Sequence, residues 1–139
     1  MEYLIKKDTD GHVTRWVCRG LNDCEKWLND HMTYGFYVDA KLVGGLIFHD
    51  CRPYHDIWWT VFSTDKRWCN RRMLRKMFGL VFEQMKCRKI NLLVDTDNAA
   101  SVHFVEKLGF KKEGIWRCCR ENGKNCYLYG MLKDECQWI

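Results

Sequence analysis

The order of apolar and polar positions along the chain predicts strands separated by helices. Short runs rich in β-branched and aromatic residues, bounded by turn residues, are typical of strands. Such runs lie at residues 3–5, 34–38, 42–49, 57–63, 90–94, 111–120 and 126–132. The Asp39-Ala40-Lys41 turn joins the second and third runs into a hairpin, and Asn122-Gly123 is expected to join the last two through a tight type I′ turn.

Three further regions have helical or ambiguous patterns. Residues 70–86 have apolar positions at the helical period, which predicts a long helix with one face made of Met73, Met77, Leu80, Val81 and Met85. A capping-box pattern at residues 22–25 predicts a short helix that continues to about Met32. Residues 12–19 are ambiguous, and a second strand is permitted by the alternation of Val13, Arg15 and Val17 with Thr14, Trp16 and Cys18.

The last predicted helix has a start signal, an apolar face and a stop signal. Asp97 or Asn98 can cap it, because a short polar side chain accepts a hydrogen bond from a free amide of the first turn. Residues 99–108 then form about three turns. Gly109 ends the helix, since glycine tolerates the left-handed conformation of a C-terminal cap. The expected apolar face consists of Ala100, Phe104 and Leu108.

The resulting order of elements is roughly ββ/α, βββ, α, β, α, ββ. It predicts an α+β fold with a mixed, mostly antiparallel central sheet flanked by helices. A chain of 139 residues, 14% of them aromatic, is long enough for one hydrophobic core. The single proline and the lack of a Ser/Gly-rich tract argue against a linker, so we expect one domain over residues 1–139.

Composition narrows the environment and the ligands. The nine cysteines do not predict a disulfide scaffold, because their number is odd and most lie in predicted helices or strands. We expect reduced, mostly buried thiols in a cytoplasmic protein, and without a C-x-x-C pair the pattern favours no metal site. No apolar run approaches the roughly 20 residues of a membrane span, and the charged N-terminus is unlike a signal peptide. The net charge of +5 suits an anionic ligand.

One stretch resembles a known family. Asn98-x-x-Ser101, followed by Glu106-Lys107-Leu108-Gly109-Phe110-Lys111-x-Glu113-Gly114, is similar to the last conserved segment of the GNAT family of acetyl-coenzyme A (acetyl-CoA) dependent N-acetyltransferases. Within the family it most resembles the branch that acetylates ribosomal-protein N-termini and related amines. The resemblance implies acetyl-CoA as co-substrate, an amine as acceptor, and a GNAT fold in which a strand, a long helix and a further strand make the cofactor cleft.

The resemblance also implies where the cofactor phosphates bind. In the family, the turn between the aromatic strand and the long helix follows Q/R-x-x-G-x-G/A, and its amides hold the pyrophosphate. Arg67 matches the first position, whereas Asn70 replaces the first Gly and Arg72 the final Gly or Ala. Asn tolerates positive φ better than most residues, and Arg72 can reach a phosphate from the side. The implied phosphate-binding residues are Arg67, Trp68, Cys69, Asn70, Arg71 and Arg72.

The same resemblance assigns roles along the aromatic strand and the last helix. The pantetheine arm is implied to pair with the strand at Thr60, Val61, Phe62 and Ser63, and the cofactor-binding set extends to Asn98, Ser101 and Phe104. Many members of the family have a Tyr acid where this chain has Val105. In the N-terminal-acetylating branch an Asn and a Ser take over, so we expect Ser101 to assist the departing thiolate and Asn98 to orient the cofactor or a water.

The general base has no carboxylate candidate inside the aromatic strand. His49 and Asp50, in the connection that precedes it, are the candidates, because an imidazole or a carboxylate of raised pKa can deprotonate an ammonium. No Cys or Ser stands in a recognisable nucleophile–base pattern, so direct attack of the amine on the thioester is expected.

Two other functions stay open. The altered phosphate loop and the missing Tyr also fit a GNAT-like domain, similar to small viral proteins, that has lost catalysis and works as a binding or structural protein. A basic helix with Trp68 interleaved also fits nucleic-acid binding. Its cations are Lys66, Arg67, Arg71, Arg72, Arg75 and Lys76. For the oligomeric state, both a monomer and a homodimer are compatible with the sequence.

Overall fold

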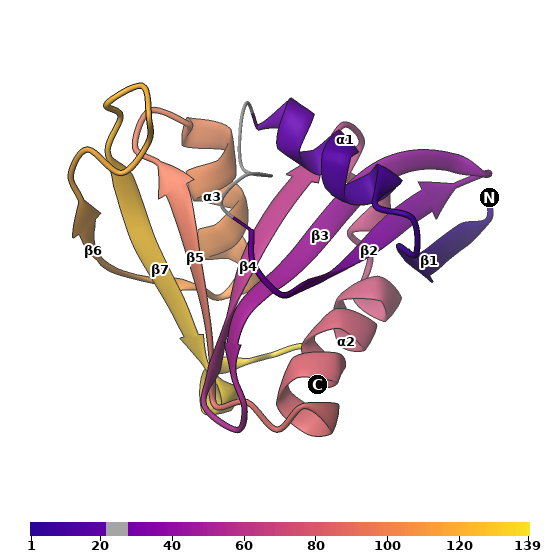
Figure 1. Ribbon diagram of the computed structural model, residues 1–139. Coiled ribbons are helices and arrows are strands. Elements are labelled where there is room, and N and C mark those ends of the chain that lie inside the picture. Colours follow the sequence, from indigo (N-terminus) through magenta and orange to yellow (C-terminus); the bar gives the residue numbers. More distant parts are fainter. Residues whose placement is uncertain (22–27) are drawn as a thin grey trace. The chain divides into compact units, whose positions relative to one another are not determined.

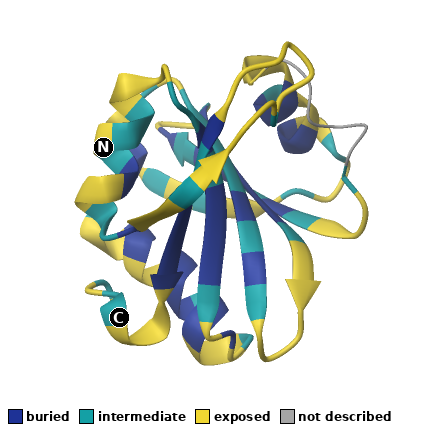
Figure 2. Cartoon of the chain, turned by 90° about the vertical axis from the view of Figure 1, so that its left-hand side faces the viewer, coloured by how far each residue is buried: buried dark blue, intermediate teal, exposed yellow. Residues whose placement is uncertain are grey.

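The computed structural model describes residues 1–21 and 28–139, and these residues divide into two compact units (Figure 1). Unit 1 comprises Met1–Cys51 and Trp58–Met77, and unit 2 comprises Arg52–Ile57 and Phe78–Ile139. Buried residues gather in the middle of the strands, and the strand ends and outer helix faces are exposed (Figure 2). No helix in the described ranges is long and apolar enough to cross a bilayer.

The sheet strands of unit 1 follow one another in sequence order. They are β1 (Tyr3–Lys7), β2 (His31–Val38), β3 (Lys41–Arg52) and β4 (Asp56–Ser63). Strands β1 and β2, and β2 and β3, pair antiparallel. Asp39 and Ala40 connect β2 to β3 with φ of 49° and 66°, the positive values that a tight primed hairpin turn requires. The predicted hairpin is thereby confirmed.

Residues 12–19 form a helix, so the second strand permitted by their alternation was wrong. Helix α1 (His12–Gly20) lies across β2 and β3 (Figure 1). The buried residues of this helix are separated by one or four positions, so they lie on one helix face. That face packs against Ile47 of β3. These residues are Val13, Thr14, Val17 and Cys18. The capping box at residues 22–25 lies outside the described residues, whereas Met32, its expected helix end, lies in β2.

Two adjacent glycines of β3 allow close packing on both of its faces. A Cβ added to Gly45 would lie 2.3 Å from Cγ2 of Val17 in α1. A Cβ added to Gly44 would lie 3.0 Å from Nε1 of Trp68 on the opposite face. Trp68 belongs to the 3₁₀ turn Lys66–Trp68 and stacks on Phe36 with ring centroids 4.2 Å apart. The missing side chains therefore set how closely the helix and the turn approach the strand.

Helix α2 (Arg71–Gly79) confirms the helix predicted near the middle of the chain. It is continued by a π-helical segment, Leu80–Gln84. Of the expected apolar face, Leu80 and Met85 are only half-buried. The π-helical segment has more residues per turn than an α-helix, so it rotates the buried face. The residues buried along the whole segment are Met73, Leu74, Met77, Phe78, Val81 and Phe82.

Unit 2 is a three-stranded antiparallel arrangement with β7 (Cys126–Leu132) between β5 (Lys89–Asp95) and β6 (Lys111–Trp116). Helix α3 (Ala99–Leu108) packs against β5, and a 3₁₀ turn, Lys133–Glu135, follows β7. The tight turn expected at Asn122-Gly123 was wrong. Only Gly123 of that pair has positive φ, and residues 117–125 form a longer loop between the two strands.

The described elements confirm the α+β class, with mostly antiparallel strands flanked by helices. The cysteines differ from expectation in two respects. Cys18 of α1 is disulfide-bonded, so the expectation of reduced thiols was wrong for this residue. Among the free cysteines of the described ranges, Cys87 and Cys126 are buried, but Cys51 and Cys118 are exposed. Their places on a strand end and a loop explain this exposure, because those positions leave part of the backbone and side chain in water.

Candidate active site

Three polar side chains of unit 1 form a continuous hydrogen-bonded chain. Nδ1 of His49 lies 2.6 Å from Oδ2 of Asp50, and its Nε2 lies 2.8 Å from Oγ1 of Thr60. An ionised carboxylate only accepts hydrogen bonds, so Nδ1 carries a proton, and a neutral imidazole then accepts from the Thr60 hydroxyl at Nε2. The structure therefore brings together the two predicted base candidates and one of the predicted cofactor-binding residues.

The backbone of Asp50 explains why neighbouring side chains meet. Adjacent residues of a regular strand point to opposite faces of the sheet. Asp50 has φ of 50°, in the region that Asp tolerates better than most residues, and this interrupts the alternation at the end of β3. The His49 side chain is 14% exposed and that of Asp50 is 58% exposed. His49 is thus held inside the unit, with its carboxylate partner reaching it from the solvent side. Both residues lie within β3, so the predicted strand at residues 42–49 continues through Asp50, which the sequence placed in the connection.

Thr60 is the partner that the sequence did not reveal. The sequence analysis expected Thr60 only to pair with the pantetheine arm through its backbone. No local sequence pattern connects Thr60 with His49. The feature that brings Thr60 to His49 is the pairing of β3 with β4, because residues on the same face of neighbouring strands lie within reach of each other. Thr60, Val61, Phe62 and Ser63 are all half-buried. Phe62 meets Trp16 of α1 edge-on, with ring centroids 5.1 Å apart.

Asp56, at the start of β4, has a structural role. It accepts hydrogen bonds from Nε and Nη2 of Arg52 at 2.7 and 2.9 Å, and from the Asn91 side chain at 3.0 Å. The bonds from Arg52 are the main reason that the pKa of Asp56 is lowered, and Asn91 adds to the effect. A carboxylate with a lowered pKa is a poor general base, so Asp56 is not a further candidate for that role.

The predicted phosphate loop uses several of its own amides internally. Asn70 precedes α2 and caps it, since its Oδ1 accepts from the Met73 amide at 3.0 Å. The amide of Cys69 donates to the Lys66 carbonyl and that of Asn70 to the Trp68 carbonyl, both at 2.9 Å. The backbone of Asn70 does not have positive φ, so the conformation here does not need the family's glycine.

The side chains of this loop are divided between the interior and the solvent. Trp68 is 4% exposed, which prevents its indole from stacking on a base and removes one reason for the nucleic-acid interpretation. The guanidinium of Arg67 donates to both carboxylate oxygens of Asp65, and this pairing lowers the pKa of Asp65 to about 2. Arg71 and Arg72 are exposed in the first turn of α2. Of the cations at this helix start, Arg67 is therefore already paired.

In unit 2, Asn98 and Ser101 meet at the start of α3. Oδ1 of Asn98 accepts from the Ser101 amide at 3.1 Å, and Gly109 ends the helix with φ of 111°, which confirms the predicted cap residue, helix and stop. The Ser101 hydroxyl makes no hydrogen bond to the described residues. The expected apolar face was wrong in part, because Ala100 is exposed and Val105 is the buried residue. Phe104 is half-buried on α3.

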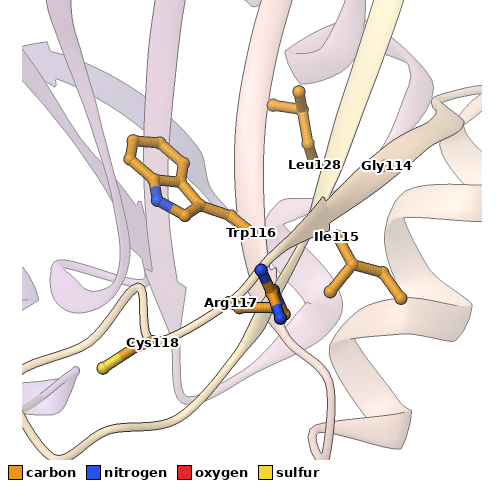
Figure 3. A pocket seen from close by; sticks show the side chains of 6 residues that line it. All are labelled: Gly114, Ile115, Trp116, Arg117, Cys118 and Leu128. Atoms are coloured by element: carbon orange, nitrogen blue, oxygen red, sulfur yellow. The ribbon is translucent and has the colours of Figure 1, made fainter.

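An open hollow of about 710 Å³ lies along β6 of unit 2 (Figure 3). Ile115 and Trp116 are 62% and 52% exposed there, although both are large and apolar. Among the residues that the structure describes, the lining contains one cation, Arg117, and no carboxylate. The residues that line the hollow are Gly114, Ile115, Trp116, Arg117, Cys118 and Leu128. The described lining is therefore mostly apolar.

Comparison with known proteins gives a consistent family assignment. Residues 1–111 match the model of an acetyltransferase (GNAT) domain. Mutant forms of the spermidine/spermine N-acetyltransferase SpeG from Vibrio cholerae share the fold, with a TM-score of 0.72, 13% identity and 96% of each chain covered. A putative acetyltransferase from T. thermophilus has a TM-score of 0.66 and 18% identity, over 84% of this chain and 64% of its own. No curated protein sequence matches the chain. Neither structure supports the finer placement in the ribosomal-protein branch.

Proposed function

The chain belongs to the GNAT family of acetyltransferases, and from this premise we propose that it transfers an acetyl group from acetyl-CoA to an amine by direct attack. The observation that carries the proposal is the chain of hydrogen bonds from Asp50 through His49 to Thr60. It supports His49 as the base, where the sequence offered only separate candidates. Members of the family need such a group, because an amine attacks only after its ammonium has lost a proton.

In the proposed mechanism, the Thr60 hydroxyl receives a proton from the acceptor ammonium and passes its own proton to Nε2 of His49. Asp50 holds the imidazole in the accepting tautomer and stabilises the imidazolium that forms. The free amine then attacks the thioester carbonyl carbon, and the carbon–sulfur bond breaks as the amide forms. Ser101 would donate a hydrogen bond to the departing thiolate, with Asn98 fixing the first turn of α3 around it.

The cofactor would be held by both backbone and charge. The backbone of Val61 and Phe62 would orient the pantetheine arm and the acyl group, as the family resemblance implies. Arg71 and Arg72, exposed in the first turn of α2, would meet the phosphates together with the helix dipole. Arg67 would contribute after exchanging its Asp65 partner for phosphate, since both ligands accept the same pair of donors.

For the acceptor, the hollow along β6 favours a peptide amine over a polyamine. The SpeG structures are those of a spermidine/spermine N-acetyltransferase, and a polyamine chain is recognised through carboxylates. The described part of the lining has none, and Arg117 would repel a second ammonium. Ile115 and Trp116 instead offer an exposed apolar surface that suits an uncharged side chain of the acceptor. A protein N-terminus, a lysine or a small apolar amine fits that description.

The test compares His49→Gln and Thr60→Val with the unchanged protein. Acetylation of a mixture of unblocked peptides and of spermidine is followed by mass spectrometry. We expect His49→Gln to lower kcat/KM by about 10²–10⁴-fold, the usual contribution of a general base. His103→Gln is the matched control, because His103 is exposed on α3 and outside the proposed relay. Equal activity of His49→Gln and the control would contradict the assignment of the base, and acetyl-Thr60 in the mass spectrum would replace direct attack by a covalent route.

A second candidate function rests on the phosphate loop. The amides of Cys69, Asn70 and Met73 are hydrogen-bonded within the loop and helix start, which fits a GNAT-like binding protein that no longer holds acetyl-CoA. Calorimetric titration with acetyl-CoA separates the two functions. Binding at micromolar concentration supports the enzyme, and no heat of binding at millimolar concentration supports the second candidate.

A further inference from the structure

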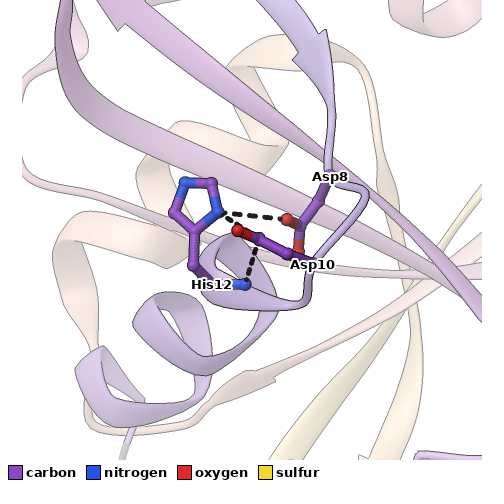
Figure 4. A group of neighbouring side chains, drawn as sticks. All are labelled: Asp8, Asp10 and His12. Atoms are coloured by element: carbon purple, nitrogen blue, oxygen red, sulfur yellow. Dashed lines mark hydrogen bonds and ion pairs between the residues drawn. The ribbon is translucent and has the colours of Figure 1, made fainter.

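The turn between β1 and α1 brings two carboxylates and an imidazole together (Figure 4). Nδ1 of His12 lies 2.5 Å from Oδ1 of Asp10 and 3.3 Å from Oδ1 of Asp8. One atom from each of the three side chains falls within 4.8 Å of the other two. In sequence terms, Asp8-Thr9-Asp10-Gly11 is typical of a turn, because Asp and Gly are favoured at turn positions.

Asp8 provides an independent indication that something binds here. Its side chain is only 2% exposed, and Oδ1 has no hydrogen-bond partner. Oδ2, by contrast, accepts from the amide and the hydroxyl of Thr14 at 3.1 and 3.2 Å. The polar contact of Oδ1 within the described residues is its 3.3 Å ion pair with Nδ1 of His12. A buried carboxylate oxygen without a hydrogen bond is costly, since burial removes the water that would otherwise solvate it. This oxygen faces the His12 imidazole, where a cation would satisfy it.

Residues around the turn orient both ligands. Nε2 of His12 lies 3.3 Å from the Tyr37 hydroxyl of β2, so Nδ1 is the nitrogen presented to the carboxylates. Thr14, which holds Oδ2 of Asp8, is itself hydrogen-bonded to Thr33 at 2.7 Å. Metal ligands in proteins are commonly supported by such outer hydrogen bonds, which fix the ring orientation of a histidine and the position of a carboxylate.

We propose that Asp8, Asp10 and His12 bind a divalent transition-metal ion, of which Mn²⁺ and Zn²⁺ are the leading examples. One imidazole nitrogen with two carboxylates suits these ions better than Ca²⁺ or Mg²⁺, which prefer oxygen ligands alone. The side chains of Asp10 and His12 are 68% and 53% exposed, which leaves room for water to complete the coordination. The ion would tie β1 to the start of α1, and the site does not depend on the proposed acetyltransferase activity.

The test uses Mn²⁺ alone with the full chain, followed by loss of the free-ion signal in electron paramagnetic resonance. Mn²⁺ is preferred as the probe because the free cysteines of the chain would also bind Zn²⁺. The variants are Asp10→Asn and His12→Gln, whose side chains are exposed enough to be changed without opening the core. Asp10→Asn also retains an oxygen for the hydrogen bond that Asp10 accepts from the His12 amide. The matched controls are Asp134→Asn and His103→Gln, both at exposed positions elsewhere.

We expect one bound Mn²⁺ per chain, weakened at least about tenfold by Asp10→Asn and by His12→Gln and unchanged in the two controls. Circular dichroism of each variant verifies the fold. Three results would overturn the proposal: no binding at millimolar Mn²⁺, undiminished binding in both site variants, or the same loss in the controls as in the site variants. The first two would leave the contacts between His12 and the two carboxylates as the account of this cluster.

Discussion

Helices α2 and α3 begin with the same cap and continue with different residues. Asn70 accepts from the amide three residues ahead, and Asn98 does the same, at 3.0 and 3.1 Å. After the cap, α2 continues with two arginines at residues 71–72, whereas α3 continues with two alanines at residues 99–100. Neither first turn contains an acidic residue. The geometry of the two helix starts is therefore alike, and their charge is not.

The difference teaches what each helix start is suited to do. A cation in the first turn opposes the helix dipole and is unfavourable by about 0.3–1 kcal/mol, unless an anion lies beside it. At Arg72 the positive charge is thus unfavourable for the helix alone and favourable for a bound phosphate. The start of α3 has no such charge, so any part that it takes in the reaction must come from the Ser101 hydroxyl. We accordingly expect binding defects from changes in α2 and rate defects from changes in α3.

The largest effect is expected from reversing a charge at the start of α2. Arg72→Glu should weaken acetyl-CoA binding about 100-fold, because a hydrogen bond to a charged group contributes about 1.5–3 kcal/mol and the new carboxylate repels the phosphates. Calorimetry at moderate salt measures the change. Arg75→Glu, one turn further along the exposed face, is the control for net charge. If both variants lose the same affinity, α2 acts only as a diffuse positive surface.

A smaller effect, on rate rather than on binding, is expected from α3. Ser101→Ala should lower kcat about tenfold and leave KM unchanged, the loss expected for one hydrogen bond made only in the transition state. The cap survives, since Asn98 accepts from the Ser101 backbone. Ser101→Thr keeps the hydroxyl and should restore most of the rate. A raised KM with unchanged kcat would show that Ser101 serves cofactor binding instead.

The smallest effect compares the two caps directly. Asn70→Gly restores the family's glycine and releases the Met73 amide, so acetyl-CoA should bind a few-fold more tightly. Replacing an Asn cap by Gly costs only a few tenths of a kcal/mol of stability. Asn98→Gly should cause a similar small loss of stability, measured by urea denaturation, without tightening the cofactor. Equal affinity in Asn70→Gly and the unchanged protein would mean that the Met73 amide takes no part in binding.

Local signals in the sequence predicted most of the helices and strands. The cap at Asn98 and the stop at Gly109 fixed α3 to the residue, because each acts through its own backbone and nearest neighbours. Helix α1 was missed, since in residues 12–19 both periods place Val13 and Val17 on one side. The loop between β6 and β7 was predicted to be too short, because Asn-Gly favours a tight turn only where the flanking strands pair as far as the turn.

The candidate site was less predictable than the fold. His49 and Asp50 could be named from their chemistry, but their partner Thr60 depends on strand pairing, which no local pattern fixes. The burial of Trp68 is a tertiary effect of the same kind, since Phe36 lies far from it in the chain. The sequence shows that Asp8, Asp10 and His12 lie close together along the chain. The sequence does not show that Oδ1 of Asp8 is buried, because this burial depends on β2 and α1 together.

The glycine pair of β3 has a consequence for how this sequence can diverge. A methyl group on Gly45 would fall within 2.3 Å of a branched, stiff side chain, so Val17 cannot withdraw by an easy change of rotamer. A larger residue at position 45 therefore requires a smaller side chain at position 17. The two positions should vary together among descendants of this chain. Gly44 is less constrained, because a methyl group there would lie 3.0 Å from Nε1 of Trp68. The side chains that limit residue size at positions 44 and 45 thus lie on opposite faces of β3.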